Sequence, residues 1–142
     1  MSSVSKALRE EIKHSFYPFI KERGFIKQKS DSPYFAKFSR QRNGRTETFD
    51  LQWDKYWRPY FVLNFGSREQ GEQPGRLQRS RGGDQWHWFS LRRPWLKKLT
   101  SGKWNYTPAQ VSQELIAAFG ELETWWETGV AGPHIYIYEL HA

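Results

Sequence analysis

The sequence predicts an α+β protein with a single antiparallel sheet of about five or six strands. An N-terminal and a C-terminal helix are expected to pack mainly on one face of this sheet. Two observations lead to this prediction. Apolar residues recur every three or four positions near both ends of the chain, whereas between residues 25 and 66 they alternate with polar ones. No connection in that central part is long enough for a crossover helix, so neighbouring strands should be antiparallel.

The first helix is predicted over about residues 4–23. Its buried stripe consists of five apolar residues at steps of one, three and four, with charged residues between them: Leu8, Ile12, Phe16, Phe19 and Ile20. Pro18 lacks an N–H and should clash with the carbonyl of His14, so we expect a kink or a break there. Gly24 is expected to end the helix as a left-handed cap.

The central part of the chain predicts a β-hairpin followed by a third strand. Residues 35–40 and 46–53 form the hairpin, because the pair Asn43-Gly44 accepts the positive φ angles of a type I′ turn. The third strand is expected over residues 59–65, where apolar and polar positions again alternate.

Further strands are expected to be short. Residues 66–84 contain five glycines and several charges around a possible strand at Leu77, and we predict that most of this segment is a loop. Residues 85–91 are expected to form an edge or final strand of the sheet. The tail, over residues 134–140, alternates Ile with Tyr and could add a last strand.

The second helix has a clear start. Thr107 is expected at the cap, Pro108 at the first helical position and Gln110 three residues after the cap. Gly120 costs about 1 kcal/mol against Ala, so the helix could bend or split there. Gly129 is expected to end it. Its predicted buried face contains Val111, Leu115, Ala118, Leu122 and either Trp125 or Trp126.

Composition narrows the class of protein. The 142 residues fit one domain, 1–142, in which aromatic residues, 18% of the chain, supply much of the buried area. The absence of Cys excludes disulfides, Cys-ligated zinc and thiol nucleophiles. No apolar run resembles a signal peptide or a membrane helix, so we expect a soluble, cytoplasmic protein without a membrane partner.

Charge is distributed unevenly along the chain. Residues 76–104 contain eight Lys or Arg, one acid and four of the eight Trp, whereas residues 105–142 contain five Glu and neither Lys nor Arg. Cationic side chains mixed with large aromatic faces are suited to an anionic partner with planar groups, and nucleic acid or an acidic protein would be such a partner. The candidate binding residues are Arg79, Arg81, Trp86, His87, Trp88, Arg92, Arg93 and Trp95, together with Trp57 and Tyr60 from the segment 54–60.

Simpler interpretations compete with this one. The basic stretch could face the Glu-rich helix that follows, or only solvent, and these are the more common situations for such stretches. Likewise, Asp50, Gln52, Tyr60 and Asn64 would line the sheet face away from the helices, which could be a ligand floor or, more commonly, an ordinary solvated face.

No catalytic or metal-binding signature is found. The four His lie in different segments without the spacing that places two imidazoles on one helical face. No Ser sits in a Gly-x-Ser-x-Gly elbow, and no Gly-rich segment matches a phosphate-binding loop. We therefore expect a non-enzymatic protein without a metal or other cofactor.

The order of short motifs resembles a widespread, uncharacterised bacterial family, a domain of unknown function. The resemblance spans about residues 5–128 and implies an α+β domain, but it implies no catalytic residues. It is carried by Gly24-Phe25-Ile26-Lys27, Tyr34-Phe35-Ala36-Lys37-Phe38, Val62-Leu63-Asn64-Phe65-Gly66, Gly75-Arg76-Leu77 and Trp86-His87-Trp88.

Three hypotheses for the function follow. The first is a binding module that contacts an anionic partner, nucleic acid being the most natural, through the basic, Trp-rich stretch. The second is an immunity or antitoxin-like protein that covers a partner's active site, although its basic charge argues partly against an inhibitor of a basic nuclease. The third is a small-molecule pocket lined by Tyr60, Trp53 and Asn64. The sequence does not predict an oligomeric state.

Overall fold

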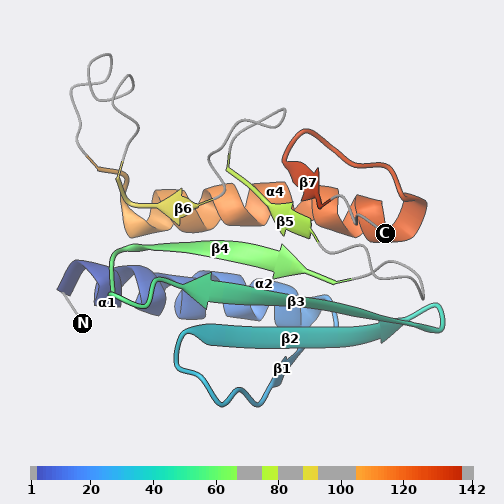
Figure 1. The fold of residues 1–142 in the computed structure, drawn as a ribbon, viewed down its shortest axis with the longest axis horizontal. Coiled ribbons are helices and arrows are strands. Elements are labelled where there is room, and N and C mark those ends of the chain that lie inside the picture. The colour runs from blue at the N-terminus through green and yellow to red at the C-terminus, as the bar shows by residue number, and fades with distance from the viewer. Residues whose placement is uncertain (1–2, 67–74, 80–87, 93–104, 139–142) are drawn as a thin grey trace.

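The computed structural model describes residues 3–66, 75–79, 88–92 and 105–138 (Figure 1). Within them, one antiparallel sheet has the strand order β1-β2-β3-β4-β5-β7, and β6 pairs with the beginning of β4. Its strands are β1 (Ile26–Gln28), β2 (Phe35–Arg42), β3 (Arg45–Trp53), β4 (Tyr60–Phe65), β5 (Gly75–Leu77), β6 (Phe89–Ser90) and β7 (Ile135–Ile137). With the two helical segments described below, this confirms the predicted fold class.

The hairpin of β2 and β3 is the longest pairing in the sheet. Its register joins Phe35 to Gln52 at one end and Arg42 to Arg45 at the other. Asn43 and Gly44 form the two-residue turn with φ angles of 53° and 73°, which are the left-handed values of a type I′ turn. The predicted hairpin and its turn are therefore confirmed.

The N-terminal helix continues past Pro18, where a kink or break was predicted, but its α-helical hydrogen bonding is interrupted just before this residue by a π-helical turn. It consists of α1 (Ser3–Glu11), a π-helical turn η1 (Ile12–Phe16) and α2 (Tyr17–Glu22). The N–H of Tyr17 bonds the carbonyl of Ile12, five residues earlier. This wider turn ends just before Pro18, which then occupies the first turn of α2, where a missing N–H needs no partner.

The three helix boundaries that the sequence indicated are confirmed. Gly24, with φ 91°, follows α2, and the N–H groups of Gly24 and Phe25 bond the carbonyls of Lys21 and Ile20. The last helix, α4 (Pro108–Thr128), begins with a capping box between Thr107 and Gln110. It does not split at Gly120, where an added Cβ would meet no atom beyond the backbone of its own helix within 4 Å, and it ends at Gly129.

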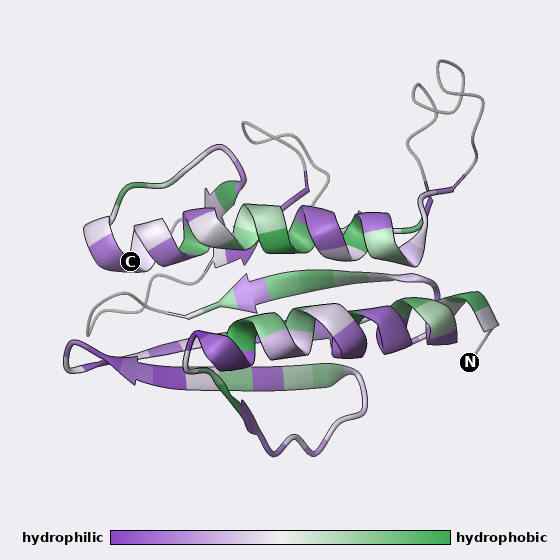
Figure 2. Cartoon of the chain, turned by 180° about the vertical axis from the view of Figure 1, so that it is seen from behind, coloured by the Kyte–Doolittle hydropathy of each residue, from purple (hydrophilic) through white to green (hydrophobic). Residues whose placement is uncertain are grey.

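The helices lie side by side on one face of the sheet. They are behind the strands in Figure 1 and in front of them in Figure 2, where hydrophobic and hydrophilic segments alternate along both, as expected for helices with one buried side. The core between these layers is rich in aromatic rings. Phe49 of β3 is its centre, with ring centroids 5.0 to 6.1 Å from those of Phe16, Phe25, Phe38 and Phe119.

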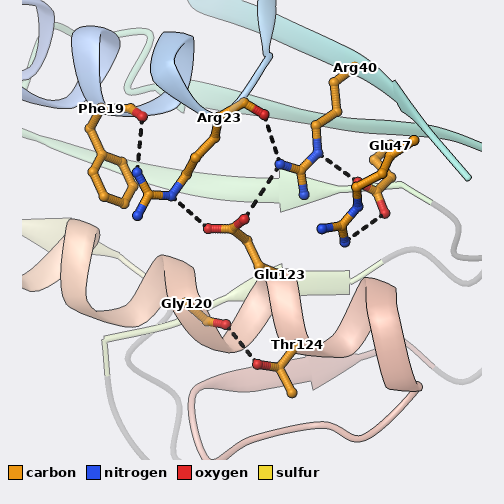
Figure 3. A network of polar contacts seen from close by, with 8 residues as sticks. Phe19, Arg23, Arg40, Glu47, Gly120, Glu123 and Thr124 are labelled. Atoms are coloured by element: carbon orange, nitrogen blue, oxygen red, sulfur yellow. Dashed lines mark hydrogen bonds and ion pairs between the residues drawn. The ribbon is translucent and has the colours of Figure 1, made fainter.

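A polar network joins the helices to the hairpin (Figure 3). Arg40, buried in β2, places its Nε 2.7 Å from Oε1 of Glu47 and its Nη1 3.4 Å from Oε2 of Glu123. Glu123 also accepts a hydrogen bond of 2.8 Å from Nε of Arg23. Glu123, from the acidic end of the chain, therefore serves as a partner of two arginines inside the fold.

The short strands agree with the sequence in part. A strand was expected around Leu77 and another in the tail, and β5 and β7 confirm both. Of the strand expected over 85–91, residues 88–91 lie among the described residues, and Phe89–Ser90 form β6. Strand β1 was not among the strands predicted from the alternation of apolar and polar residues. It pairs with β2 at the edge of the sheet, and all three of its residues are exposed.

Candidate anion-binding site

The basic, Trp-rich stretch is described only in part. Of its candidate residues, Arg79, Trp88 and Arg92 lie in the described segments. Arg92 is exposed, and its N–H donates a hydrogen bond of 3.0 Å to Oγ of Ser90. The other candidates lie outside the described residues: Arg81, Trp86, His87, Arg93 and Trp95.

Arg79 points into the fold. Its side chain is 10% exposed, and its Nε lies 2.8 Å from Oε2 of Glu114 on α4. The guanidinium also lies over the ring of Tyr106, 4.7 Å from the centroid, and burial lowers its pKa. This pair places Arg79 against the acidic helix, the arrangement that the intramolecular alternative predicts for it. The charge of Arg79 is therefore balanced inside the fold, and its side chain is not free at the surface.

The face of the sheet away from the helices carries a row of mutually bonded polar residues. Nδ2 of Asn64 donates to Oδ1 of Asp50 over 2.9 Å and to Oε1 of Gln52 over 3.1 Å, while its Oδ1 accepts from Nε of Arg76 over 2.9 Å. Burial raises the pKa of Asp50, and the hydrogen bond from Asn64 opposes this rise. Three of the four residues proposed as a ligand floor thus bond one another. The fourth, Tyr60, lies against Trp88 at the β6 end of β4.

A tight turn over residues 54–59 holds the remaining predicted residues at that end of the sheet. Asp54 accepts hydrogen bonds from the N–H groups of Tyr56 and Arg58, at 3.0 and 3.1 Å, and a bidentate pair from the Arg58 guanidinium at 3.0 and 2.9 Å. These bonds lower the pKa of Asp54 to about 2, and the bonds from the Arg58 side chain contribute most to this shift. The turn is therefore firmly fixed.

Trp57 is held by the N-terminal helix. Its φ of 61° is left-handed, which is costly for a bulky residue. Oγ of Ser5 donates a hydrogen bond to the Trp57 carbonyl, and the Arg9 guanidinium lies 4.7 Å from the centroids of both the Trp53 and the Trp57 rings. The ring of Tyr34 packs on Trp57 at 5.4 Å. These contacts keep the unusual backbone in place.

The turn forms one side of a cavity of about 420 Å³, which we call the aromatic cavity. Tyr56 stands at this cavity with 68% of its surface exposed, and cations lie on its ring, Lys55 at 5.1 Å and Arg58 at 5.4 Å. Tyr60 packs edge-on against Trp88, which also lines the cavity. The other described lining residues are Tyr34, Phe35, Gln52, Trp53 and Asp54.

A second cavity, of about 570 Å³, lies between the N-terminal helix and the connection from β1 to β2, and we call it the basic cavity. That connection projects beyond the edge of the sheet in Figures 1 and 2. Four cationic side chains line the cavity, and among its described lining residues a single one, Asp31, is acidic. The cations are Arg9, Lys13, Lys27 and Lys29.

Local structure explains how these cations meet. Arg9, Lys13 and Tyr17 are four residues apart, so the helix presents them on one side. Lys27 is paired with Phe38, whose buried side chain contacts Tyr17, and paired residues of antiparallel strands point to the same face. Lys27 therefore points to the helix side of β1, toward the basic cavity.

The electrostatics of the basic cavity favour an anion. Among the residues that the structure describes, no carboxylate lies within 4.0 Å of the ammonium groups of Lys13, Lys27 and Lys29. Burial lowers the pKa of Arg9, and the adjacent Tyr17 has a pKa raised by its own burial, which the charge of Arg9 opposes. An anion in the cavity would supply the counter-charge that these cations lack.

Phe35 and Trp53 are lining residues of both cavities. The cationic and the aromatic cavity thus both lie at the end of β2 and β3 that carries these two residues. Within the described ranges, no three His, Asp or Glu side chains are grouped to hold a metal ion, and no helix is long and apolar enough to cross a membrane.

The four cations of the basic cavity were not predicted from the sequence. One signal was present: residues 1–33 hold seven basic and four acidic residues, and Arg9 and Lys13 have helical spacing. The sequence does not show that the connection after β1 folds back beside that helix, which is what brings Lys27 and Lys29 to them.

Comparisons with known proteins do not assign this chain to a family. No protein-family model matches the chain, and neither the curated proteins nor the solved structures searched contain a match.

Proposed function

We propose that this protein is a non-enzymatic binding module for an anionic partner, nucleic acid, and that phosphate groups bind in the basic cavity. The observation that carries the proposal is the gathering of four cationic side chains around a cavity of about 570 Å³ with a single acid among its described lining residues. Its volume is in the range of sites that hold small ligands or parts of larger ones.

The ion-pairing of these cations supports a role in binding. Structural cations are commonly paired with a carboxylate, as Arg79 and Arg40 are in this fold. The three lysines of the basic cavity have no such partner among the described residues. Phosphates that bind them would release condensed counterions, which is the main source of affinity for proteins that bind nucleic acid without reading its sequence.

The proposed phosphate-binding surface differs from the one that the sequence-based hypothesis named. Arg79 is paired internally, so it is not assigned a partner contact. Trp57, Tyr60 and Trp88 remain next to the proposed site, in or beside the aromatic cavity. The basic cavity replaces the stretch 76–104 as the main phosphate-binding surface.

A salt titration tests the proposal. Binding of a fluorescein-labelled single-stranded oligonucleotide is measured by anisotropy from low to moderate salt for the wild type and for the double variant Lys27→Ala/Lys29→Ala. Each lost phosphate contact should reduce the slope of log K against log salt by about 0.7, so the double variant should lose about 1.4.

The matched control is Lys6→Ala/Lys21→Ala, which removes two exposed lysines of the N-terminal helix that do not line the cavity. It should keep the wild-type slope. Absence of binding at low salt would overturn the proposal, and equal losses in the two double variants would show that the cavity is not the phosphate site.

A further inference from the structure

We infer that the aromatic cavity is a base-binding subsite, so that the partner is a single strand with at least one unpaired base beside the phosphate held in the basic cavity. This inference rests on the proposed function. It assigns the class of nucleic acid and a position for the base, neither of which follows from a cluster of positive charge alone.

The chemistry of the aromatic cavity fits a planar, electron-rich ring. Its walls include Tyr34, Phe35, Tyr56 and Trp88, and the amide of Gln52 can both donate and accept a hydrogen bond. Stacking on aromatic side chains is the main way in which proteins hold unpaired bases, and it is tolerant of base identity because every base has a π-face. A volume of about 420 Å³ gives space for one base with part of its sugar.

Tyr56 is a large aromatic residue whose exposure packing does not explain. A tyrosine with 68% of its surface exposed stabilises the fold little, yet its backbone is fixed in the turn, because Asp54 accepts hydrogen bonds from the N–H groups of Tyr56 and Arg58. The ammonium group of Lys55 lies 5.1 Å from the centroid of this ring and is placed to meet a phosphate next to a stacked nucleotide, whereas Arg58 is already paired with Asp54. An exposed aromatic residue beside a cation, on a fixed backbone, is suited to capture a base.

The turn is also organised before any ligand binds. Asp54 closes it from within, and Ser5 holds the carbonyl of Trp57 from the N-terminal helix. A binding surface that is already fixed loses little conformational entropy when its partner arrives, which raises affinity.

The combination of the two cavities favours single-stranded over duplex nucleic acid. Phe35 and Trp53 line both cavities, so a strand that passes this end of β2 and β3 would place a phosphate in the basic cavity and a base in the aromatic cavity. In a duplex the bases are paired and stacked on each other, so none is free to enter. Polyphosphate offers charge without a base. We therefore expect the order of affinity single strand, then duplex, then polyphosphate.

The experiment compares four probes at one low salt concentration: a short single-stranded DNA, an abasic strand with the same number of phosphates, the corresponding duplex and inorganic polyphosphate. The single strand should bind about 10-fold more tightly than the abasic strand, which is the effect of one lost stacking contact. Quenching of tryptophan fluorescence by the base-containing strand gives a second readout, because Trp53 and Trp88 line the cavity.

Variants assign the effect to the cavity. Tyr56→Ala should weaken binding of the single strand about 10-fold and leave polyphosphate unchanged, while Tyr56→Phe keeps the ring and should restore the affinity. Tyr136→Ala, which removes an exposed tyrosine from β7, is the matched control and should have no effect.

The two ideas fail in different ways. If the single strand and the abasic strand bind equally, or Tyr56→Ala has no effect, the base subsite is wrong and the phosphate site still stands. If none of the four probes binds at low salt, the proposed function fails as well, and an acidic protein becomes the partner to seek.

Discussion

Nε of Arg79 lies 2.8 Å from Oε2 of Glu114, so a cation of the basic stretch meets an acid of the helix that follows it in the chain. The Arg79 side chain is 10% exposed and that of Glu114 is 35% exposed. The uneven distribution of charge along the sequence is thus neutralised in part within the fold, where Arg79, two residues after β5, meets α4.

Replacement of Glu114 by Gln should lower the free energy of unfolding by about 1 to 2 kcal/mol, because it leaves a buried guanidinium without its counter-charge. The value stays modest because Glu114 is itself partly exposed to water. Urea unfolding measures it. The control Glu22→Gln, at an exposed position of α2, should change stability by less than about 0.5 kcal/mol. Equal effects of the two variants would show that the pair contributes nothing.

Asp54 should make stability depend on acid pH. Its folded pKa of about 2 lies below the ordinary value of 3.8, so the ionised form stabilises the fold above about pH 4, and this contribution is lost as the pH falls toward 2. The Asp54→Asn variant should be less stable than the wild type by about 1 to 2 kcal/mol at pH 7, a figure reduced for screening by solvent. Unfolding curves from pH 7 to pH 2 should show the difference shrink; a constant difference would contradict the assignment.

Two glycines should respond in opposite ways to replacement by Ala. In β5, a Cβ at Gly75 would overlap the ring of Phe65 and the carbonyl oxygen of Tyr136, so Gly75→Ala should destabilise the protein by about 3 kcal/mol. In α4, a Cβ at Gly120 meets nothing within 4 Å, so Gly120→Ala should stabilise it by about 0.5 to 1 kcal/mol. Thermal unfolding of both variants checks the signs.

The buried pair of Arg40 and Glu47 should be sensitive to the loss of one partner. Glu47→Ala removes the main counter-charge of a guanidinium that is 5% exposed, and the expected loss is about 3 kcal/mol. The double variant Arg40→Met/Glu47→Leu should recover much of it, since an apolar pair needs no charge compensation. Failure of the double variant to recover would indicate that Glu123, bonded to Arg40, or Arg42, bonded to Glu47, depends on the partner that was removed.

Much of the fold was predictable from the sequence where residues close together in the chain determine the local structure. The pair Asn43-Gly44 determines the hairpin turn, and Thr107 with Gln110 determines where the last helix begins. These signals act within four residues, so tertiary contacts have little scope to override them. The π-helical turn before Pro18 was not predictable in the same way, because proline excludes one hydrogen bond without specifying which alternative replaces it.

The candidate site was predictable only in part for a related reason. Trp57, Tyr60 and Trp88 do gather near one cavity, as aromatic residues next to turns often do. The direction of Arg79 depends on which acid packs against it, and the basic cavity depends on Lys27 meeting Arg9 across a connection that has no regular structure. Charge and spacing identify residue types, but contacts between distant segments decide which side chains are left free.

The strand order has a consequence for how the chain reaches this fold. Strands β1 to β4 each pair with the next strand along the chain, whereas Ile135 of β7 pairs with Leu77 of β5 across 58 residues. Closing that long loop costs entropy before any contact compensates for it. The four-strand meander should therefore form early, β7 should join last, and its amide protons should be the first in the sheet to exchange with solvent deuterium.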